Sequence, residues 1–416
     1  MSSKERYKQQ AAEWIAARQT ELVQLLQALI QARSDYPPGD TRAAAGVCLD
    51  ALSRWGIEAR AVCPPPEVRS FHADGVDNAA MPSVIGTLRG GEGPCLLLNA
   101  HIDTVPAGEL SHWRHDPFGG QLEDGFVYGR GAGDDKGSVA AQLMAACALK
   151  AVGVPLAGTL QVNPVADEEA SSFRGAKWLC AAGLLRPDMV IVGEQTANQV
   201  CCAERAITNF RVTIHGRACH GAMPWQGSNA TVHMARFIGL VNDLLAPELA
   251  KTAHPYLPPT TLCATRIRGG HKVNIIPELC ELELDCRMVP GIAEEFVKQR
   301  MEELLGALSL GGSLFGWEVA VTYSEGGLAT NTSPDAPLIR SLLAEAGQVQ
   351  RSAPVLSGYK QASDGRVFAG LGVPIAIFGP GDPALGHSPE ERVPVQELVE
   401  ASQILARTAI GLLAQE

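Results

Sequence analysis

Residues 96–108 read LLLNAHIDTVPAG and residues 127–137 read VYGRGAGDDKG, and the rest of the chain is interpreted around these two stretches. The apolar run that ends at Ala100 has the length of a buried strand, and it places His101 and Asp103 at its carboxyl end. Ligand sites in open α/β sheets lie at that end of the strands. Residues two apart in a strand face the same side. We therefore expect His101 to bind a metal and the Asp103 carboxylate to accept the second ring N–H of His101.

Other metal-type ligands follow further along the chain. Asp134 lies in a glycine-rich turn before an alanine-rich helix, where a carboxylate could bridge two cations. Glu169 and Glu194 each follow a predicted strand, and His387 follows a glycine-rich segment near the carboxyl terminus. A capping aspartate, a solvated glutamate or a surface histidine explains each residue taken singly. Their joint placement at the carboxyl ends of strands in one sheet favours a metal site.

Three consecutive acids, Asp167, Glu168 and Glu169, end the strand predicted over residues 158–165. Adjacent carboxylates at a strand end repel one another unless a cation or a proton is shared among them. This run therefore indicates metal binding or proton transfer.

The order of predicted elements indicates two domains. Strands and helices alternate up to residue 192 and again after residue 333, which predicts an α/β fold with a mixed, mostly parallel sheet and helices on both faces. Residues 4–32 predict one amphipathic helix on this domain. Between the two parts, the predicted order is β-α-β-β-α-β, a complete small α+β unit. We expect a catalytic domain of residues 1–206 and 325–416, and an inserted lid or dimerisation domain of residues 207–324.

Composition narrows the class of protein. The chain has 416 residues, of which 46% are hydrophobic and 19% charged, as in a soluble globular enzyme. A net charge of −11 disfavours nucleic acid as a partner, because phosphate binding needs a basic surface. The sequence has no apolar run of the ~20 residues that a membrane span needs, and its polar amino terminus lacks the pattern of a signal peptide. We expect a cytoplasmic enzyme that acts on a small molecule.

Eight motifs in this order resemble those of the M20 metallopeptidases, in particular the acetylornithine deacetylase and succinyl-diaminopimelate desuccinylase group. The resemblance extends from about residue 84 to the carboxyl terminus. Its motifs are NAHIDTVP, YGRGAGDDKG, ADEEAS, VGEQT, GRACHGAMPWQGSNA, GGHKVNIIP, ASDGRVFAGLGVP and FGPGD with GHSPEERV.

The resemblance implies a pair of zinc ions in each subunit, with cobalt or manganese as alternatives. One ion is expected on His101, Asp134 and Glu194. The other is expected on Asp134, Glu169 and His387, so that Asp134 bridges the two. Nitrogen and oxygen ligands of this kind suit zinc and leave room for water and substrate.

The resemblance also implies roles for residues that do not bind the metal. Glu168 is expected to be the general base. Asp103, from its position two residues after His101, is expected to assist catalysis by orienting that ring. In such enzymes the inserted domain is a lid that forms a homodimer, and His220 is expected to stabilise the oxyanion in the partner subunit's active site. The peptide between Asp134 and Asp135 is expected to be cis.

Three further residues are candidates for gripping the carboxylate of the substrate. Arg366 in ASDGR and Asn274 in GGHKVN match family motifs, and the planar fork of an arginine suits a carboxylate. Arg287 is a weaker candidate, since an arginine near a strand end is more often part of a structural ion pair.

The sequence thus predicts a dizinc amidohydrolase that removes the acyl group of an N-acyl amino acid. The same site could belong to a dipeptidase, a carboxypeptidase or an N-carbamoyl amino acid hydrolase, because the motifs do not report the shape of the substrate cleft. A reading of another class is a homologue that binds metal or ligand without catalysis.

Overall fold

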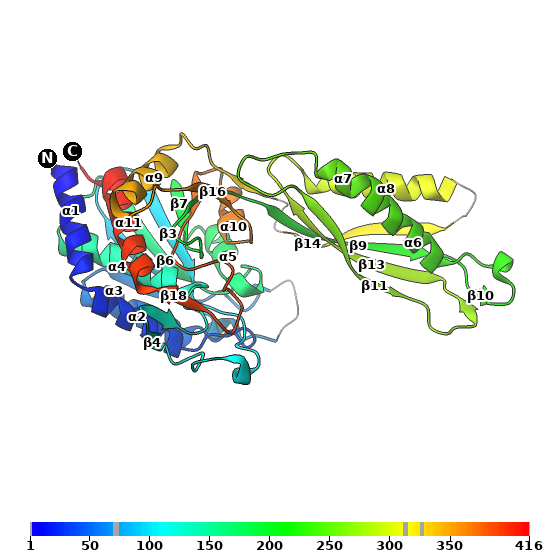
Figure 1. Cartoon of the computed structure of the whole chain (residues 1–416), viewed down its shortest axis with the longest axis horizontal. Helices are drawn as coiled ribbons and strands as arrows, with labels where there is room; N and C mark the ends of the chain where they lie inside the picture. The colour runs from blue at the N-terminus through cyan, green and yellow to red at the C-terminus, as the bar shows by residue number, and fades with distance from the viewer. Residues whose placement is uncertain (1, 70–74, 311–314, 325–327, 416) are drawn as a thin grey trace. The chain divides into compact units, whose positions relative to one another are not determined.

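A computed structural model describes residues 2–69, 75–310, 315–324 and 328–415, which form two compact units (Figure 1). The first unit contains Met1–Ala203, Asn331–Tyr359 and Ser363–Glu416, and the second contains Glu204–Thr330 and Lys360–Ala362. The predicted insert, 207–324, lies within the second unit. The predicted return to the first domain, at residue 325, lies outside the described residues.

The first unit is built on a nine-stranded sheet with the order β1-β2-β6-β3-β7-β17-β8-β15, and β16 pairs with β8. Its strands are β1 (Glu58–Val62), β2 (Ser83–Arg89), β3 (Cys95–His101), β6 (Thr159–Val165), β7 (Met189–Val192), β8 (Val200–Glu204), β15 (Thr330–Asn331), β16 (Leu356–Tyr359) and β17 (Ile375–Ile377). A separate small sheet joins β4 (Leu122–Glu123), β5 (Phe126–Tyr128) and β18 (Arg392–Pro394).

The centre of the large sheet is parallel. Strand β3 runs parallel to both β6 and β7, and β7 runs parallel to β17. The sheet becomes antiparallel on either side of these four strands, where β2 pairs with β6 and with β1, and β8 pairs with β17. His101 pairs with Val165 in the register of β3 and β6, so the carboxyl ends of these two strands lie side by side.

Helices cover both faces of this sheet, which confirms the predicted fold class. The helices are α1 (Ser3–Ala16), α2 (Gln19–Gln31), α3 (Arg42–Arg54), α4 (Lys136–Ala151), α5 (Ala176–Ala181), α9 (Pro337–Val349), α10 (Gly365–Ala369) and α11 (Val395–Leu413). Helix α4 packs on β3, and α2, α3 and α11 surround it, which agrees with its almost entirely buried, alanine-rich sequence. Leu179 of α5 and Phe368 of α10 share a core cluster with Leu97 of β3.

The prediction of one helix over residues 4–32 is wrong, because the chain turns at Ala17 and Arg18 between α1 and α2. The Arg18 guanidinium lies 4.3 Å from the centre of the Trp14 ring at this turn. Apolar side chains on both helices, such as Ile15 and Leu22, are nevertheless fully buried. Periodicity reports which faces are apolar, so it did not reveal a two-residue turn that keeps both faces toward the core.

The second unit is a four-stranded antiparallel sheet with helices packed on one face. Its strand order is β11-β13-β9-β14, and a two-stranded sheet joins β10 to β12. Its elements are β9 (Ala206–His215), β10 (Cys219–His220), α6 (Ala230–Leu240), a π-helical turn (Val241–Leu245), α7 (Ala246–Leu249), β11 (Thr261–Gly269), β12 (Ile275–Ile276), β13 (Leu279–Met288), α8 (Glu294–Leu310) and β14 (Gly316–Ser324).

The core of the second unit is formed by the buried residues that alternate with more exposed ones along its strands. Phe210 of β9 and Leu284 of β13 face Phe237 of α6 in one buried cluster. Between the buried positions, Arg211 and Glu283 form an ion pair with a 3.2 Å contact. The order of the main elements is the predicted β-α-β-β-α-β, with β10 and β12 added. Among the described residues of the chain, no helix is both long enough and apolar enough to span a membrane.

Candidate metal centre

The predicted ligands gather where β3 and β6 end. His101 is the last residue of β3, Asp134 lies in the turn before α4, and Glu169 lies in a 3₁₀ turn (Glu168–Ala170) after β6. One ligand atom from each of these three residues lies within 4.8 Å of the others. They come together because parallel β3 and β6 end at the same edge of the sheet.

Asp134 is the centre of this group. Its Oδ1 lies 3.0 Å from Nε2 of His101, and its Oδ2 lies 3.1 Å from Nε2 of His387. Burial opposes ionisation, but hydrogen bonds to the two imidazole rings lower the pKa of Asp134 below its usual range. The two oxygens of one carboxylate thus face two different histidines.

His387 also contacts Glu169, with 3.1 Å between Nε2 and Oε1. It reaches the cluster from the segment before β18 and adopts a left-handed backbone conformation with φ of 59°. The two residues predicted to share the second ion with Asp134 are therefore in direct contact with each other.

Glu194 follows β7, which lies beside β3 in the sheet. Its carboxyl group is buried, and Oε2 accepts a hydrogen bond from the Tyr359 hydroxyl at 2.8 Å. Burial, reinforced by the charge of Asp134, raises the pKa of Glu194 well above its ordinary value. Glu194 lies outside the group of three residues whose ligand atoms are within 4.8 Å of one another.

The predicted hydrogen bond from His101 to the carboxylate of Asp103 is wrong. Nδ1 of His101 lies 2.9 Å from the backbone oxygen of Asp103 but 3.8 Å from the nearest carboxylate oxygen. The carboxylate instead accepts the backbone N–H groups of Glu168 at 3.3 Å and Glu169 at 3.2 Å. The main-chain oxygen of Asp103 therefore orients the His101 ring. The side chain of Asp103 orients the turn that carries Glu168 and Glu169. Burial raises the pKa of its carboxyl to about 6.

Glu168 and Arg366 lie near each other beside this centre, with Oε1 of Glu168 4.0 Å from Nη2 of Arg366. Burial, together with the charge of Asp364, raises the pKa of Glu168 well above its ordinary value, although the charge of His101 opposes this shift. A carboxyl group with a raised pKa suits a general base. Nε of Arg366 donates to the backbone oxygen of Ser363 at 3.0 Å, which fixes the direction of its side chain.

The remaining predicted residues belong to the second unit. His220 on β10 pairs with Ile275 on β12, and the N–H of Gly221 donates to the backbone oxygen of Asn274 at 2.8 Å. His220 and Asn274 are thus brought together on one exposed tip. By contrast, Nε of Arg287 lies 2.9 Å from Asp285, which favours the alternative of a structural ion pair.

Three buried residues around the ligands were not predicted. Tyr359 contacts Glu194, and Nε2 of Gln195 donates to Oδ2 of Asp134 at 2.9 Å. Glu391 accepts the N–H groups of Gly133 and Asp134, both at 3.1 Å. It also forms an ion pair with Arg130, and burial raises the pKa of Glu391 to about 7. Gln195 follows the predicted ligand Glu194 in the motif VGEQT, and Glu391 lies four residues after His387 in GHSPEERV, but only their contacts reveal what they do.

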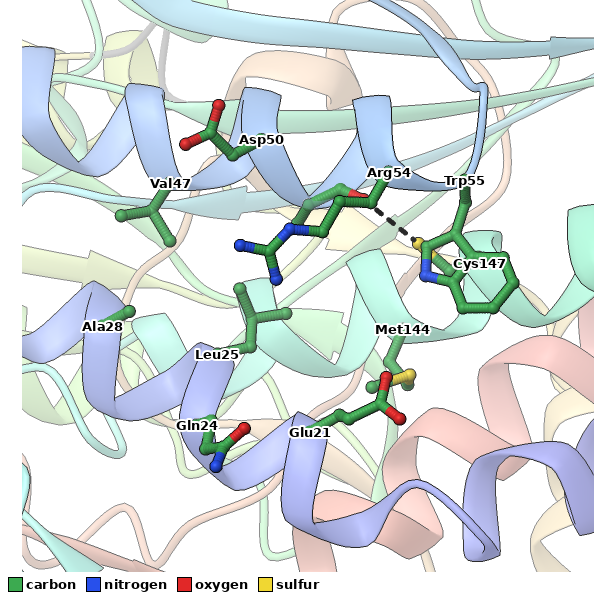
Figure 2. Close-up of a pocket in the computed structure, with 11 residues that line it drawn as sticks. Glu21, Gln24, Leu25, Ala28, Val47, Asp50, Arg54, Trp55, Met144 and Cys147 are labelled. Carbon is green, nitrogen blue, oxygen red and sulfur yellow. Dashed lines mark hydrogen bonds between the residues drawn. The ribbon is translucent and has the colours of Figure 1, made fainter.

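A pocket of about 420 Å³ lies elsewhere in the first unit, between α2, α3 and α4 (Figure 2). Its wall includes Leu25, Val47 and Met144, with Asp50 and Arg54 from α3. None of the predicted ligands or catalytic residues lines this pocket. The predicted ligands thus lie at the strand ends and not in this pocket.

The fold and the centre at its strand ends define a metal-dependent hydrolase that acts on amide or peptide bonds. Residues 97–410 match the family described as Peptidase family M20/M25/M40, and the chain belongs to that family.

Relatives with known names agree with this assignment. The chain is 31% identical over 338 residues to the acetylornithine deacetylase of Myxococcus xanthus, a match that covers 80% of this chain and 85% of the relative. It is 32% identical over 341 residues to the succinyl-diaminopimelate desuccinylase of Bordetella petrii, covering 78% and 84%. It is 26% identical over 348 residues to a Bacillus subtilis deformylase of N-formyl-4-amino-5-aminomethyl-2-methylpyrimidine, covering 78% and 81%.

Solved structures share the fold. Aminopeptidase PepT from Bacillus cereus superposes with a TM-score of 0.72 at 19% identity, covering 95% of this chain and 98% of that chain. Human carnosine dipeptidase 1 has a TM-score of 0.70 at 18% identity, covering 97% and 98%. YXEP of Bacillus subtilis, described as a dinuclear metal binding peptidase, has a TM-score of 0.70 at 17% identity, covering 95% and 98%.

Proposed function

We propose that the protein is a dizinc amidohydrolase that removes the acyl group from the nitrogen of an N-acyl amino acid. The observation that carries this proposal is the position of Asp134, whose two carboxylate oxygens face His101 and His387 separately. A bridging carboxylate needs one oxygen for each cation. Imidazole nitrogen and carboxylate oxygen are the donors that zinc takes, so these residues fit a zinc pair.

In this proposal His101, Asp134 and Glu194 would hold one ion, and Asp134, Glu169 and His387 the other. When bound, the pair would polarise the amide carbonyl of the substrate and lower the pKa of water. Cobalt or manganese would fit the same donors.

Glu168 is the general base in this proposal. Its carboxylate takes a proton from the attacking water and delivers it to the nitrogen of the departing amine. Burial raises the pKa of Glu168 above its ordinary value, which is the direction of shift expected for a carboxylate that acts as a general base. Asp103 supports it by holding the backbone N–H groups of Glu168 and Glu169.

Substrate binding is assigned to Arg366 and Asn274. The planar guanidinium of Arg366 offers paired donors to the carboxylate of an amino acid, and its fixed position near Glu168 supports that role. Asn274 shares an exposed tip with His220. We propose that the chain forms a homodimer through the second unit, and that the partner subunit's His220 stabilises the oxyanion.

The names of the relatives favour deacylation over peptide cleavage. A deacetylase, a desuccinylase and a deformylase each remove an acyl group from nitrogen, and their identity to this chain is 26–32%. The structural neighbours named as peptidases are at most 20% identical and support the fold alone.

The test is release of free amine from a panel of N-acetyl, N-succinyl, N-formyl and N-carbamoyl amino acids, with dipeptides alongside. Each substrate is incubated with zinc-loaded protein and with protein treated with a chelator. We expect chelator-sensitive release from one acyl class. Activity confined to dipeptides would assign the chain to the peptidases. Stoichiometric zinc binding without hydrolysis of any substrate would support a binding role.

A further inference from the structure

We propose that Gln195 is a positioning residue that fixes the orientation of the Asp134 carboxylate and thereby sets the metal affinity of the site. The inference rests on the proposed role of Asp134 as the bridging ligand. It concerns a residue that donates to a ligand and has no assigned part in the chemistry.

The contact is direct and buried. Nε2 of Gln195 donates to Oδ2 of Asp134 at 2.9 Å, and only 2% of Gln195 is exposed. The same oxygen lies 3.1 Å from Nε2 of His387, whereas Oδ1 faces His101. A carboxylate oxygen has two lone pairs, so Oδ2 can accept from Gln195 and still offer a lone pair on the side of His387. The N–H group of Gln195 therefore determines how the Asp134 carboxylate is rotated about its Cβ–Cγ bond.

The carboxamide of Gln195 has little space in which to move. A Cβ built on Gly386 would lie 2.2 Å from Nε2 of Gln195, and one built on Gly133 would lie 3.2 Å from Oε1. A Cβ on Gly381 would lie 3.6 Å from the Cβ of Gln195. Gly133 precedes Asp134, and Gly386 precedes His387. The side chain is thus packed between the two segments that carry these ligands.

The direction of the amide supports a specific donor role. Among the described residues, Oε1 of Gln195 has no hydrogen-bond partner although it is buried. Rotating the amide by half a turn would place that oxygen against Oδ2 of Asp134, so that two acceptors would face each other. The site therefore leaves one polar atom unpaired and keeps the N–H directed at Asp134. A glutamate here would bring a second carboxylate against Asp134, which explains why a neutral donor suits the position.

Loss of a hydrogen-bonding partner that orients a metal ligand typically weakens metal binding by ~10–100-fold. We expect this loss in Gln195→Met, which keeps the length of the side chain and removes the donor. Zinc affinity is measured on apo-protein by competition with a chromophoric chelator, and cobalt-loaded protein supplies a second readout through its visible absorption spectrum. Both should change in this variant.

Gln142→Met is the matched control. Gln142 is equally buried, with 2% exposed, and its Nε2 donates to the backbone oxygen of Asn99 at 2.9 Å instead of to a predicted ligand. This variant should lose thermal stability and keep the wild-type zinc affinity and cobalt spectrum. If Gln195→Met does not fold, Gln195→Leu, which also lacks the donor, replaces it.

The outcomes separate this proposal from the proposed function. Wild-type affinity and spectrum in a folded Gln195 variant would overturn the role of Gln195 and leave the metal centre in place. A wild-type protein that binds no zinc or cobalt would overturn both. Weaker metal binding in the Gln195 variant, with the Gln142 variant unchanged, supports the positioning role.

Discussion

The Tyr359 hydroxyl donates to Oε2 of Glu194 at 2.8 Å, and this bond joins the end of β16 to the second residue after β7. Both side chains are buried, so the bond lies in surroundings where water cannot replace it.

Tyr359→Phe should weaken binding of one metal ion by ~10–100-fold, because it removes only the hydroxyl that orients Glu194. Zinc stoichiometry at limiting metal should fall toward one ion per chain, and excess zinc should restore activity. Unchanged affinity for both ions would show that Glu194 is not oriented by this bond.

Glu168→Gln should reduce kcat by at least ~10²-fold, since the amide cannot accept the proton of water. Metal content should stay near that of the wild type, because Glu168 is not a predicted ligand. Steady-state kinetics and metal analysis of the same preparation check both points. Retention of most of the activity would eliminate Glu168 as the general base.

His220→Ala should lower kcat by ~10²–10³-fold if this histidine stabilises the oxyanion. Mixing this variant with Glu168→Gln under conditions that exchange subunits tests which subunit supplies it. A mixed dimer would have one site with both Glu168 and the partner's His220 intact, so activity should return. If the mixture stays inactive, His220 acts in the active site of its own subunit or takes no part in catalysis.

Chelation should lower the melting temperature, because a cation that binds only the folded chain stabilises it by mass action. At a free metal concentration 100 times the dissociation constant, the effect is about 2.7 kcal/mol, or roughly 4–5 °C for a unit as large as the first. Calorimetry with and without zinc checks the shift. An equal shift in a His101→Ala variant would argue that the stabilising ion binds elsewhere.

Lys8 gives a prediction that is independent of the metal. Burial lowers its pKa, but hydrogen bonds to Glu345 and Glu5 raise it by more, so the net shift is upward. A raised pKa means that the folded state holds the proton more tightly than the unfolded state. The contribution is therefore fully present below the ordinary lysine pKa of about 10.4 and is lost as the pH rises through the higher value of the folded chain.

Lys8→Met should destabilise the chain by about 1 kcal/mol at neutral pH, because it removes the hydrogen bonds from the ammonium group. The loss is no larger because Glu345 keeps its bond to Arg407 at 2.7 Å. The difference from the wild type should shrink above about pH 11, where the lysine begins to lose its charge. Urea unfolding at both pH values measures it. A constant difference would mean that packing of the aliphatic stem, and not the ion pair, stabilises this contact.

The architecture and the class of chemistry could both be predicted from the amino-acid sequence. Strand and helix alternation predicted the α/β sheet with an inserted β-α-β-β-α-β unit. Residues such as His101 and Glu169 could be placed together because parallel strands end at one edge of a sheet, which converts positions far apart in the chain into neighbours. The periodicity of residues 4–32 could not locate the turn between α1 and α2, since apolar spacing is continuous across it.

The contacts between individual atoms, in contrast, depend on how the elements pack in three dimensions. Asp103 orients His101 through its main-chain oxygen and gives its carboxylate to two backbone N–H groups, a choice that alternation along a strand cannot predict. Gln195 and Tyr359 became recognisable as partners of Asp134 and Glu194 only through their contacts. Hydrogen bonds depend on distance and direction to within a few tenths of an ångström, and such precision arises only when the packed elements fix the side chains.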